Sequence, residues 1–451
     1  MICEHTLILA CTHTHTHTHT DRLASLVVPE KSFHTTNYLI TDEIVDEHYG
    51  DSVLKSLRAS GLDVTKLVVP SSSLDDTGDP STEKFKTLNV FSSLCNEIIA
   101  KGMTKNTTII SMGGGVVNNI CGFLAGSLYR GINLVHITTT MMGMVDAAID
   151  FKQAVNHRLG KNLLGCYYGA CSIIIDPELL LTQSPRAIRN GLAEAVKHGL
   201  CHSLPLLQEI MSCEDVKDAD WLTKVIQQTI ALKSPTLTHY EESDFNEMCP
   251  QYGHAVAHSC EFLSFHTGGR ALLHGEAVAI GSCVTAEIAQ IMGLCDQACV
   301  DMHYQIFRAC GLPVFVPAEM KEAEVCKQML YDKHYEMKRV TMGLLNKIGD
   351  MHCVDGAYTM VVEPETLTEA INANISKRIA GEAPKLSSKA RNTSCQSLCS
   401  ELSEFDSAES NTESNHVSDD EIDDDYSDDA DTPTSMPPCS CAHGPAVSLR
   451  A

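Results

Sequence analysis

Short apolar runs rich in β-branched residues alternate with amphipathic stretches through the first part of the chain. Each run is five or six residues long, which is typical of a buried strand, and helical apolar spacing separates one run from the next. This alternation predicts parallel βαβ units, and therefore an α/β domain built on a parallel sheet. The five expected strands cover residues 36–41, 64–69, 107–111, 134–138 and 172–176.

The pattern changes after Pro185, where β-rich runs become rare and the amphipathic stretches lengthen. About 360 residues lie between the two ends of the chain, more than one hydrophobic core usually holds. We therefore expect an α/β domain over 21–185 and a helical domain over 186–384. The clearest helical stretches are 189–202, 221–232, 255–265 and 276–291.

The two ends of the chain differ from this middle part in composition. Residues 1–20 form a low-complexity N-terminus that contains THTHTHTHT. Its alternating histidines could bind metal, or the tract could be only a repeat produced by replication slippage. Residues 385–451 are rich in Ser, Asp, Glu and Pro and are predicted to be disordered. Because Ser418 and Ser427 adjoin acidic runs, both a solubilising tail and a phosphorylated regulatory segment stay open.

The net charge of −25 does not indicate a basic partner, because fourteen Asp and Glu against one Arg in 401–451 supply −13 of it. The rest of the chain lacks the clustered Lys and Arg of a nucleic-acid groove. No stretch reaches the roughly 18 apolar residues of a membrane helix, and the N-terminus lacks signal-peptide features. The 20 cysteines fit reduced intracellular thiols. We expect a cytoplasmic protein without nucleic-acid or membrane partners.

Three segments carry candidate chemistry. Gly113, Gly114 and Gly115 end an apolar run just before a helical stretch, where backbone amides can approach a phosphate, although a glycine triplet can also be only a tight turn. His254 and His258 are four residues apart and share a helix face.

A further histidine, His274, opens the next apolar run and could meet His254 and His258 at a metal. In a chain with 21 histidines, the alternative is a set of surface or satisfied core imidazoles.

The polar segment 136–169 follows another expected strand end, where α/β proteins bind ligands. Its lysines, amides and carboxylates suit an anionic, hydroxylated substrate such as a sugar phosphate. Solvated loop charges are the alternative. The residues concerned are Asp146, Lys152, Asn156, Lys161 and Asn162.

Six ordered blocks between about residues 30 and 365 resemble the 3-dehydroquinate synthase-like sugar phosphate cyclases. They read GGGVVNNICGF, YRGINLVHITTT, VDAAIDFKQAVNHRLGKNLLGCYY, GLAEAVKHG, YGHAVAH and LLHGEAV. The resemblance implies an N-terminal NAD-binding α/β domain, an all-α metal-binding domain and a homodimer. It also implies a phosphate-eliminating lyase that oxidises a sugar phosphate transiently, releases phosphate, restores the hydride and closes a carbocycle by aldol addition.

The resemblance further implies a divalent metal, zinc or cobalt, held by Glu194, His254 and His274, with His258 as a proton-handling neighbour. Other implied catalytic residues are Asp146, Lys152, Lys197 and Glu242. Implied substrate contacts are Arg130, Asn162, Lys233, Gln251 and Lys333. Implied NAD contacts are Asp42, Glu83, Lys86, Gly114, Gly115, Val116, Asn119, Thr139, Thr140, Lys161, Leu179 and Thr182.

The departures from the dehydroquinate pattern bear on the substrate. Glu247 and Gln251 stand where that pattern has the Arg and Asn that hold the substrate, and FKQAVN and LGCYY are nearer to 2-deoxy-scyllo-inosose synthase. A carboxylate at 247 would repel an acidic substrate, so we expect a hexose phosphate such as glucose 6-phosphate. The alternatives are a 3-dehydroquinate synthase, a metal-dependent NAD polyol dehydrogenase and an inactive relative that acts as a binding protein.

Overall fold

A six-stranded parallel sheet forms the centre of the N-terminal domain, with the strands in the order β1-β8-β5-β4-β2-β3. The computed structural model describes residues 6–9, 29–71, 82–158, 160–238, 244–267, 270–329, 335–336 and 339–381. The strands are β1 (Thr6–Leu9), β2 (Asn37–Asp42), β3 (Val64–Val69), β4 (Thr108–Gly113), β5 (Asn133–Thr138) and β8 (Ser172–Ile175). The parallel sheet predicted from the alternating pattern is confirmed.

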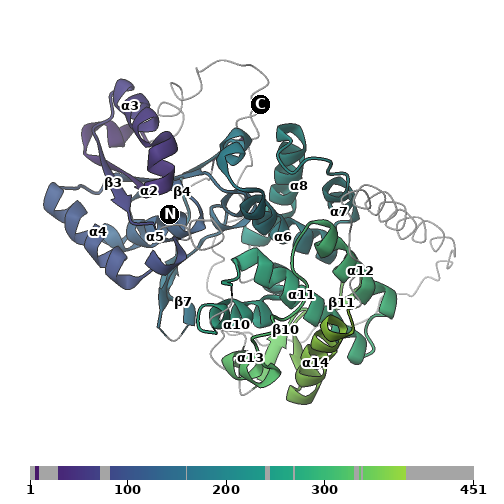
Figure 1. Ribbon diagram of the computed structural model, residues 1–451. Helices are drawn as coiled ribbons and strands as arrows, with labels where there is room; N and C mark the ends of the chain where they lie inside the picture. The colour runs from purple at the N-terminus through teal and green to yellow at the C-terminus, as the bar shows by residue number, and fades with distance from the viewer. Residues whose placement is uncertain are drawn as a thin grey trace, which may run out of the picture.

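Helices cover both faces of this sheet (Figure 1). Successive strand residues point to opposite faces, so Leu39 packs with Val53 on one side, whereas Ile40 joins a cluster with Ile98 on the other. The covering helices are α2 (Glu43–Val45), α3 (Asp51–Ala59), α4 (Leu88–Lys101) and α5 (Gly115–Ser127). Short 3₁₀ or π turns lie at η1 (Glu30–His34), η2 (Asp46–Gly50), η3 (Glu83–Phe85), η4 (Leu128–Arg130), η5 (Gly143–Ala147) and η6 (Pro177–Thr182).

An antiparallel hairpin leaves the sheet between β5 and β8. Its strands are β6 (Lys152–His157) and β7 (Gly160–Tyr167), and β6 packs on α5. Figure 1 shows β7 reaching from the N-terminal domain toward α10 of the second domain, with which it is in contact. The segment predicted to bind an anionic substrate is therefore a bridge between the two domains.

The second domain is helical, as the lengthened amphipathic stretches predicted. Helix α11 lies at its centre, because every residue from Gly275 to Ala289 is buried. The helices are α6 (Pro185–His202), α7 (Leu204–Met211), α8 (Ala219–Thr238), α9 (Asp244–Gln251), α10 (His254–Ser264), α11 (His274–Ile291), α12 (Gln297–Ala309), α13 (Glu322–Met329) and α14 (Pro364–Ala380).

Two small antiparallel sheets depart from a purely helical domain. They combine β9 (Tyr335–Glu336), β10 (Arg339–Met342) and β13 (Met360–Val362), and β11 (Leu345–Lys347) with β12 (Asp350–Met351). In the described ranges, no helix combines the length and apolar character needed to cross a membrane.

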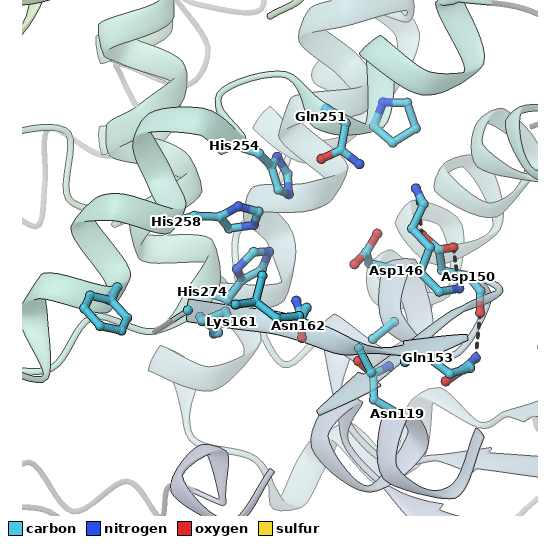
Figure 2. Close-up of a pocket in the computed structure, with 18 of the residues that line it drawn as sticks. Asn119, Asp146, Asp150, Gln153, Lys161, Asn162, Gln251, His254, His258 and His274 are labelled. Carbon is cyan, nitrogen blue, oxygen red and sulfur yellow. Dashed lines mark hydrogen bonds and ion pairs between the residues drawn. The ribbon is translucent and has the colours of Figure 1, made fainter. Parts of the chain in front are cut away.

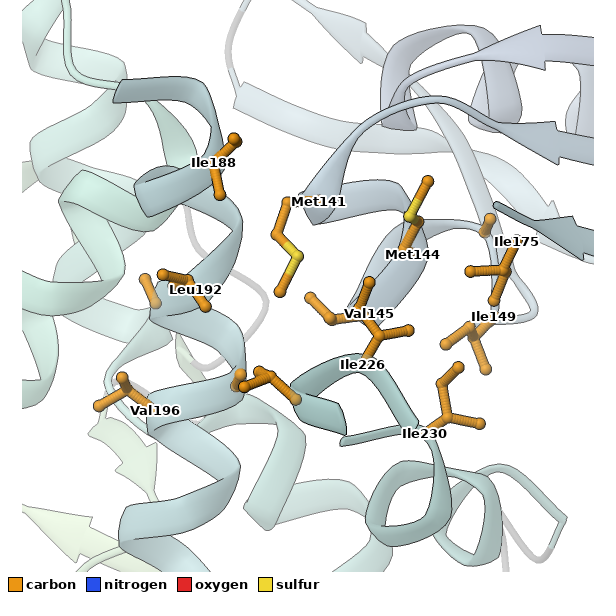
Figure 3. Close-up of a cluster of buried hydrophobic side chains, with 14 of the residues drawn as sticks. Met141, Met144, Val145, Ile149, Ile175, Ile188, Leu192, Val196, Ile226 and Ile230 are labelled. Atoms are coloured by element: carbon orange, nitrogen blue, oxygen red, sulfur yellow. The ribbon is translucent and has the colours of Figure 1, made fainter. Parts of the chain in front are cut away.

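One hydrophobic core joins the two domains. Met141 and Val145, which follow β5, pack in the same buried cluster as Ile188 and Leu192 of α6 and Ile226 of α8 (Figure 3). Burial of side chains of this size stabilises the contact by about 1.5–3 kcal/mol each. The cleft between the domains therefore has walls fixed by packing.

Several predictions fall outside the described residues. They concern the Thr-His repeat at 12–20, the acidic tail at 385–451, and the sites assigned to Glu242 and Lys333. Strand β1 lies within the expected low-complexity N-terminus and pairs with β8.

Candidate active site

Glu194, His254 and His274 converge from three different helices, α6, α10 and α11. Glu194 Oε1 lies 3.6 Å from His254 Nε2 and 3.4 Å from His274 Nε2. Tetrahedral coordination with Zn–N and Zn–O distances of about 2.0–2.2 Å separates neighbouring donor atoms by about 3.3–3.6 Å. Glu194 Oε1 is therefore spaced from each imidazole nitrogen for one zinc-sized ion, and all three donors lie within 4.8 Å of one another.

Close packing of α10 against α11 brings the two histidines together. Gly253 precedes α10 with a left-handed φ of 78°, and a Cβ there would lie 2.8 Å from the backbone nitrogen of Ser282. In return, a Cβ on Gly281 would lie 2.2 Å from the Gly253 carbonyl oxygen. Only glycine fits at this crossing, and it places His254 and His274, each the first residue of its helix, side by side.

Hydrogen bonds orient both imidazoles. His254 Nδ1 lies 3.1 Å from the Tyr252 carbonyl oxygen, and His274 Nδ1 lies 3.1 Å from Glu261 Oε2. If each Nδ1 carries the proton, both Nε2 lone pairs face Glu194, which is the usual arrangement of metal-ligating histidines.

The charged groups around His254 differ from those around His274, and the two pKa values shift in opposite directions. Burial, with the Lys197 ammonium nearby, holds the pKa of His254 well below its usual range. Burial also disfavours charge on His274, but the Glu261 and Glu194 carboxylates outweigh it and raise the pKa of His274 to about 9.

Glu194 is the acidic donor of the cluster and is fully buried. Its Oε2 accepts a hydrogen bond from Lys197 Nζ, and Lys197 also donates to the Pro250 carbonyl oxygen at 2.6 Å. Burial disfavours the charge, yet Lys197 and the two imidazoles keep the pKa of Glu194 well below its usual range. Glu194 Oε1 is buried without a hydrogen-bond partner among the described residues, so this carboxylate fits a metal that would use that oxygen.

A cavity of about 410 Å³ opens in front of these donors. Figure 2 shows His254, His258 and His274 on one side of it and Asp146 and Asp150 on the other. The ring centroid of His258 is 5.3 Å from that of His254 and 6.1 Å from that of His274. The polar and charged lining residues are Asn119, Asp146, Asp150, Lys152, Gln153, Lys161, Asn162, Gln251, His254, His258, Ser259, His274 and Gln328.

Two lysines expected near the substrate lie behind this lining. Lys233 is fully buried and binds the Asp146 carboxylate, with Asp150 Oδ2 at 3.7 Å. Burial opposes its charge, but Asp146 and Asp150 raise the pKa of Lys233. Lys197 is buried in the same way against Glu194. Lys152 does line the cavity, and its Nζ lies 3.7 Å from Asp150 Oδ2.

The hairpin carries a second charged network. Lys161 of β7 binds both the Glu261 carboxylate and Glu83 Oε1, the latter at 3.0 Å. Lys86 Nζ donates to Asn162 Oδ1 at 2.6 Å, and desolvation lowers the pKa of Lys86 to about 8. Glu83, Lys86 and Lys161, all expected at the cofactor, are thus in contact with the hairpin or part of it.

The remaining expected cofactor residues follow the carboxyl ends of parallel strands, where α/β domains bind ligands. Asp42 ends β2 and accepts hydrogen bonds from Ile44 N and Val45 N, both at 3.0 Å. Gly114 follows β4 and is the N-cap of α5, and Val116 lies in the first turn of that helix. The amides of this turn and the positive end of the helix dipole suit a pyrophosphate.

The other expected cofactor residues follow β5 and β8 in the sequence and form the rest of this sheet edge. Thr139 Oγ1 is buried without a hydrogen-bond partner among the described residues, and Thr140 Oγ1 accepts from Gly143 N at 3.1 Å. Thr182 of η6 lies 3.0 Å from the Tyr49 hydroxyl, and Leu179 packs against the sheet. The orphaned Thr139 hydroxyl fits a polar cofactor at this edge.

Arg130 is an expected substrate residue that lies away from the cavity. It is exposed in η4, at the end of α5 away from the cleft, and has a φ of 63°. Asn162 and Gln251 do line the cavity.

Sequence reasoning missed Glu261 and Asp150. Glu261 is buried on α10, seven residues after His254, and its contacts are His274 and Lys161. Its seven-residue spacing from a candidate ligand was a usable signal, because such residues share a helix face.

Comparisons with known proteins give matches over most of the chain. The family profile described as 3-dehydroquinate synthase N-terminal matches residues 79–190, and that described as 3-dehydroquinate synthase C-terminal matches 191–335. A relative from Synechocystis sp. named 3-dehydroquinate synthase is 33% identical over 348 residues, covering 76% of this chain and 91% of the relative. One from Gloeobacter violaceus with the same name is 30% identical and covers 70% and 84%.

Solved structures share the fold at lower identity. The chain is similar to 2-deoxy-scyllo-inosose synthase complexed with carbaglucose-6-phosphate, NAD+ and Co2+, with a TM-score of 0.67, 24% identity, and 82% and 96% of the two chains covered. It is also similar to 2-epi-5-epi-valiolone synthase from Streptomyces hygroscopicus with NAD+ and Zn2+ bound, with a TM-score of 0.65, 23% identity and the same coverage.

Proposed function

Because the chain belongs to the 3-dehydroquinate synthase family, we propose that it is an NAD- and metal-dependent sugar phosphate cyclase. In this reaction class a sugar phosphate loses phosphate by carbon–oxygen cleavage and closes to a carbocycle. The observation that carries the proposal is the spacing of the Glu194, His254 and His274 donors at the wall of a polar cavity.

The residues present fit both groups that such a reaction requires. Glu194, His254 and His274 would hold zinc or cobalt, and the edge formed by Asp42, Gly114 and Thr139 would hold NAD. When bound, NAD supplies reversible hydride acceptance at a substrate carbon, and the metal supplies Lewis-acid polarisation of a substrate oxygen.

The side chains of the chain itself would do the remaining work. His258 lines the cavity one helical turn from His254, where its imidazole can hold or release a proton at the substrate. Lys152 would bind phosphate oxygens.

Two buried lysines would act indirectly. Lys233 holds Asp146 in place at the cavity wall, and Lys197 holds Glu194. We assign these two lysines positioning roles, because neither lines the cavity.

We propose a hexose phosphate such as glucose 6-phosphate as the substrate. Arginine is the usual bidentate partner of a carboxylate, and no arginine is among the described residues that line the cavity. Asp146 and Asp150, which pair with Lys233, present carboxylate oxygens that can accept hydrogen bonds from hydroxyls, and Gln251 supplies a neutral amide near His254. This lining suits a substrate with one phosphate and several hydroxyls better than one with an added carboxylate, and the product would be a carbocycle such as 2-deoxy-scyllo-inosose.

The second candidate is 3-dehydroquinate synthase. The names of the sequence relatives favour it, at identities up to 33%, and its substrate carries the additional carboxylate. A homodimer, implied by the same resemblance, stays a prediction.

Phosphate release from a substrate panel tests the proposal. The full-length protein with NAD and Co²⁺ would be offered glucose 6-phosphate, sedoheptulose 7-phosphate and the seven-carbon precursor of 3-dehydroquinate. We expect phosphate release from glucose 6-phosphate without net NADH, and none from a His274→Ala control. Turnover of only the seven-carbon acid would establish the second candidate.

Two other outcomes would reject the cyclase. Stoichiometric NADH without phosphate would identify a polyol dehydrogenase, a class that includes a fission-yeast glycerol dehydrogenase of similar fold with a TM-score of 0.51. A purified protein whose metal site cannot be filled would instead indicate an inactive binding protein.

A further inference from the structure

A second cluster of metal-type donors lies behind the candidate active site. His198 and His202 are one turn apart on α6, and Cys249 faces them from α9. The three donor atoms lie within 4.8 Å of one another. None of them belongs to the cavity lining or to the Glu194 cluster.

The donor spacing is close to that of a zinc site. His198 Nδ1 lies 3.3 Å from His202 Nε2 and 4.0 Å from Cys249 Sγ. Tetrahedral zinc, with Zn–N near 2.0–2.1 Å and Zn–S near 2.3 Å, separates two nitrogens by about 3.4 Å and a nitrogen from a sulfur by about 3.6 Å. A contraction of a few tenths of an ångström at Cys249 would complete three ligand positions.

The burial and orientation of these side chains suit metal binding. His198 and Cys249 are fully buried, and His202 is partly exposed, which leaves a path for an ion. His198 Nε2 is buried without a hydrogen-bond partner in the part of the chain that the structure describes, so its Nδ1 is the atom that faces the other donors.

Cys249 presents its sulfur to the two imidazoles from the neighbouring helix. The thiolate is the form that binds metal. Cys201 belongs to the same helix as the two histidines, and its Sγ lies 4.0 Å from the Cys249 carbonyl oxygen, beside the cluster.

We propose that His198, His202 and Cys249 form a second, structural zinc site that joins α6 to α9. Two imidazoles and a thiolate are a donor set that zinc and cobalt favour and that magnesium and calcium do not. The site would fix α9 just before Pro250, whose carbonyl oxygen accepts the hydrogen bond from Lys197. None of its three ligands lines the cavity, so this proposal does not rest on the proposed reaction.

Cobalt substitution tests the site, because of the two donor clusters in the described residues this one alone contains sulfur. Titration of the metal-free, full-length protein with Co²⁺ should produce a near-ultraviolet sulfur-to-cobalt charge-transfer band that the Glu194, His254 and His274 donors cannot produce. Cys249→Ser should abolish the band and remove one zinc equivalent per chain relative to the wild type. Cys121→Ser, a matched change at a buried cysteine of α5, should retain both.

Two further variants distinguish this site from the Glu194, His254 and His274 cluster. His274→Ala should keep the band while weakening the other metal site, and His202→Gln, at a partly exposed ligand, should weaken cobalt binding at least tenfold without unfolding the chain. A wild type without the band, or a band that persists in Cys249→Ser, would overturn the proposal. Because the variants are compared with the wild type, zinc bound by the Thr-His repeat cancels.

Discussion

His274 Nδ1 lies 3.1 Å from Glu261 Oε2, so a buried carboxylate stands directly behind a candidate metal ligand. Glu261 was not among the residues expected from the sequence. Its position is that of the outer carboxylate in carboxylate–histidine–metal triads, which orients the imidazole and increases its basicity.

Glu261→Gln should weaken metal binding at the Glu194 cluster by about 10–100-fold, because the amide orients His274 without increasing its basicity. Competition with a chromophoric chelator measures this affinity. Glu287→Gln is the matched control, since Glu287 is also buried and ion-paired, with Lys377, but lies far along α11 from His274. Equal affinities in the two variants would show that Glu261 has no such role.

Glu194→Gln should destabilise the metal-free protein by about 3–5 kcal/mol, because it leaves the buried Lys197 ammonium without its carboxylate. Urea unfolding measures the change in free energy. The double variant Glu194→Gln with Lys197→Met should recover most of this loss but none of the metal binding. If the double variant is as unstable as the single one, the buried charge is not the cause.

His258→Asn should lower kcat by about 10²–10⁴-fold while the bound metal is retained, because His258 lines the cavity without belonging to the donor cluster. His254→Asn, one helical turn earlier, should lose the metal as well. Activity and metal content measured on the same samples distinguish the two. Loss of metal in His258→Asn would make it a ligand instead.

Lys86→Met should change how stability depends on pH. Since desolvation lowers the pKa of Lys86 to about 8 in the folded chain, the unfolded chain, with a lysine pKa near 10.5, binds more protons between these values. This group therefore makes the wild type more stable as the pH rises from about 8 to 10.5, and the penalty for charging it is complete below pH 8.

The difference in unfolding free energy between wild type and Lys86→Met, measured by urea at several pH values without NAD, isolates this contribution. The wild type should gain stability relative to the variant across that interval. A difference that does not change with pH would place the Lys86 pKa near its ordinary value.

Local patterns predicted the fold closely because their causes are local. The run 64–69 is β3 at the expected residues, since apolar β-branched side chains suit a buried strand. Helix α6 begins four residues before the expected 189, at Pro185, with the Ser184 hydroxyl capping Ala187 N. Serine followed by proline is a helix-start signal that the expected range did not use.

The site was harder to predict where contacts join distant segments. Lys161 meets Glu261 100 residues later, and Lys233 meets Asp146 87 residues earlier. Helical spacing cannot show such pairs. The family resemblance did bring Glu194 to the two histidines, but it carried no information on which cations would be buried behind carboxylates.

One charged side chain of the hairpin, Lys161, forms ion pairs on both sides of the cleft. Lys161 binds Glu83, an expected cofactor residue, and Glu261, which lies behind the candidate metal ligand His274. Strengthening one of these ion pairs changes the electrostatic support of the other. Binding of NAD and binding of the metal would then be coupled through Lys161, and each would alter the affinity of the other by the same factor.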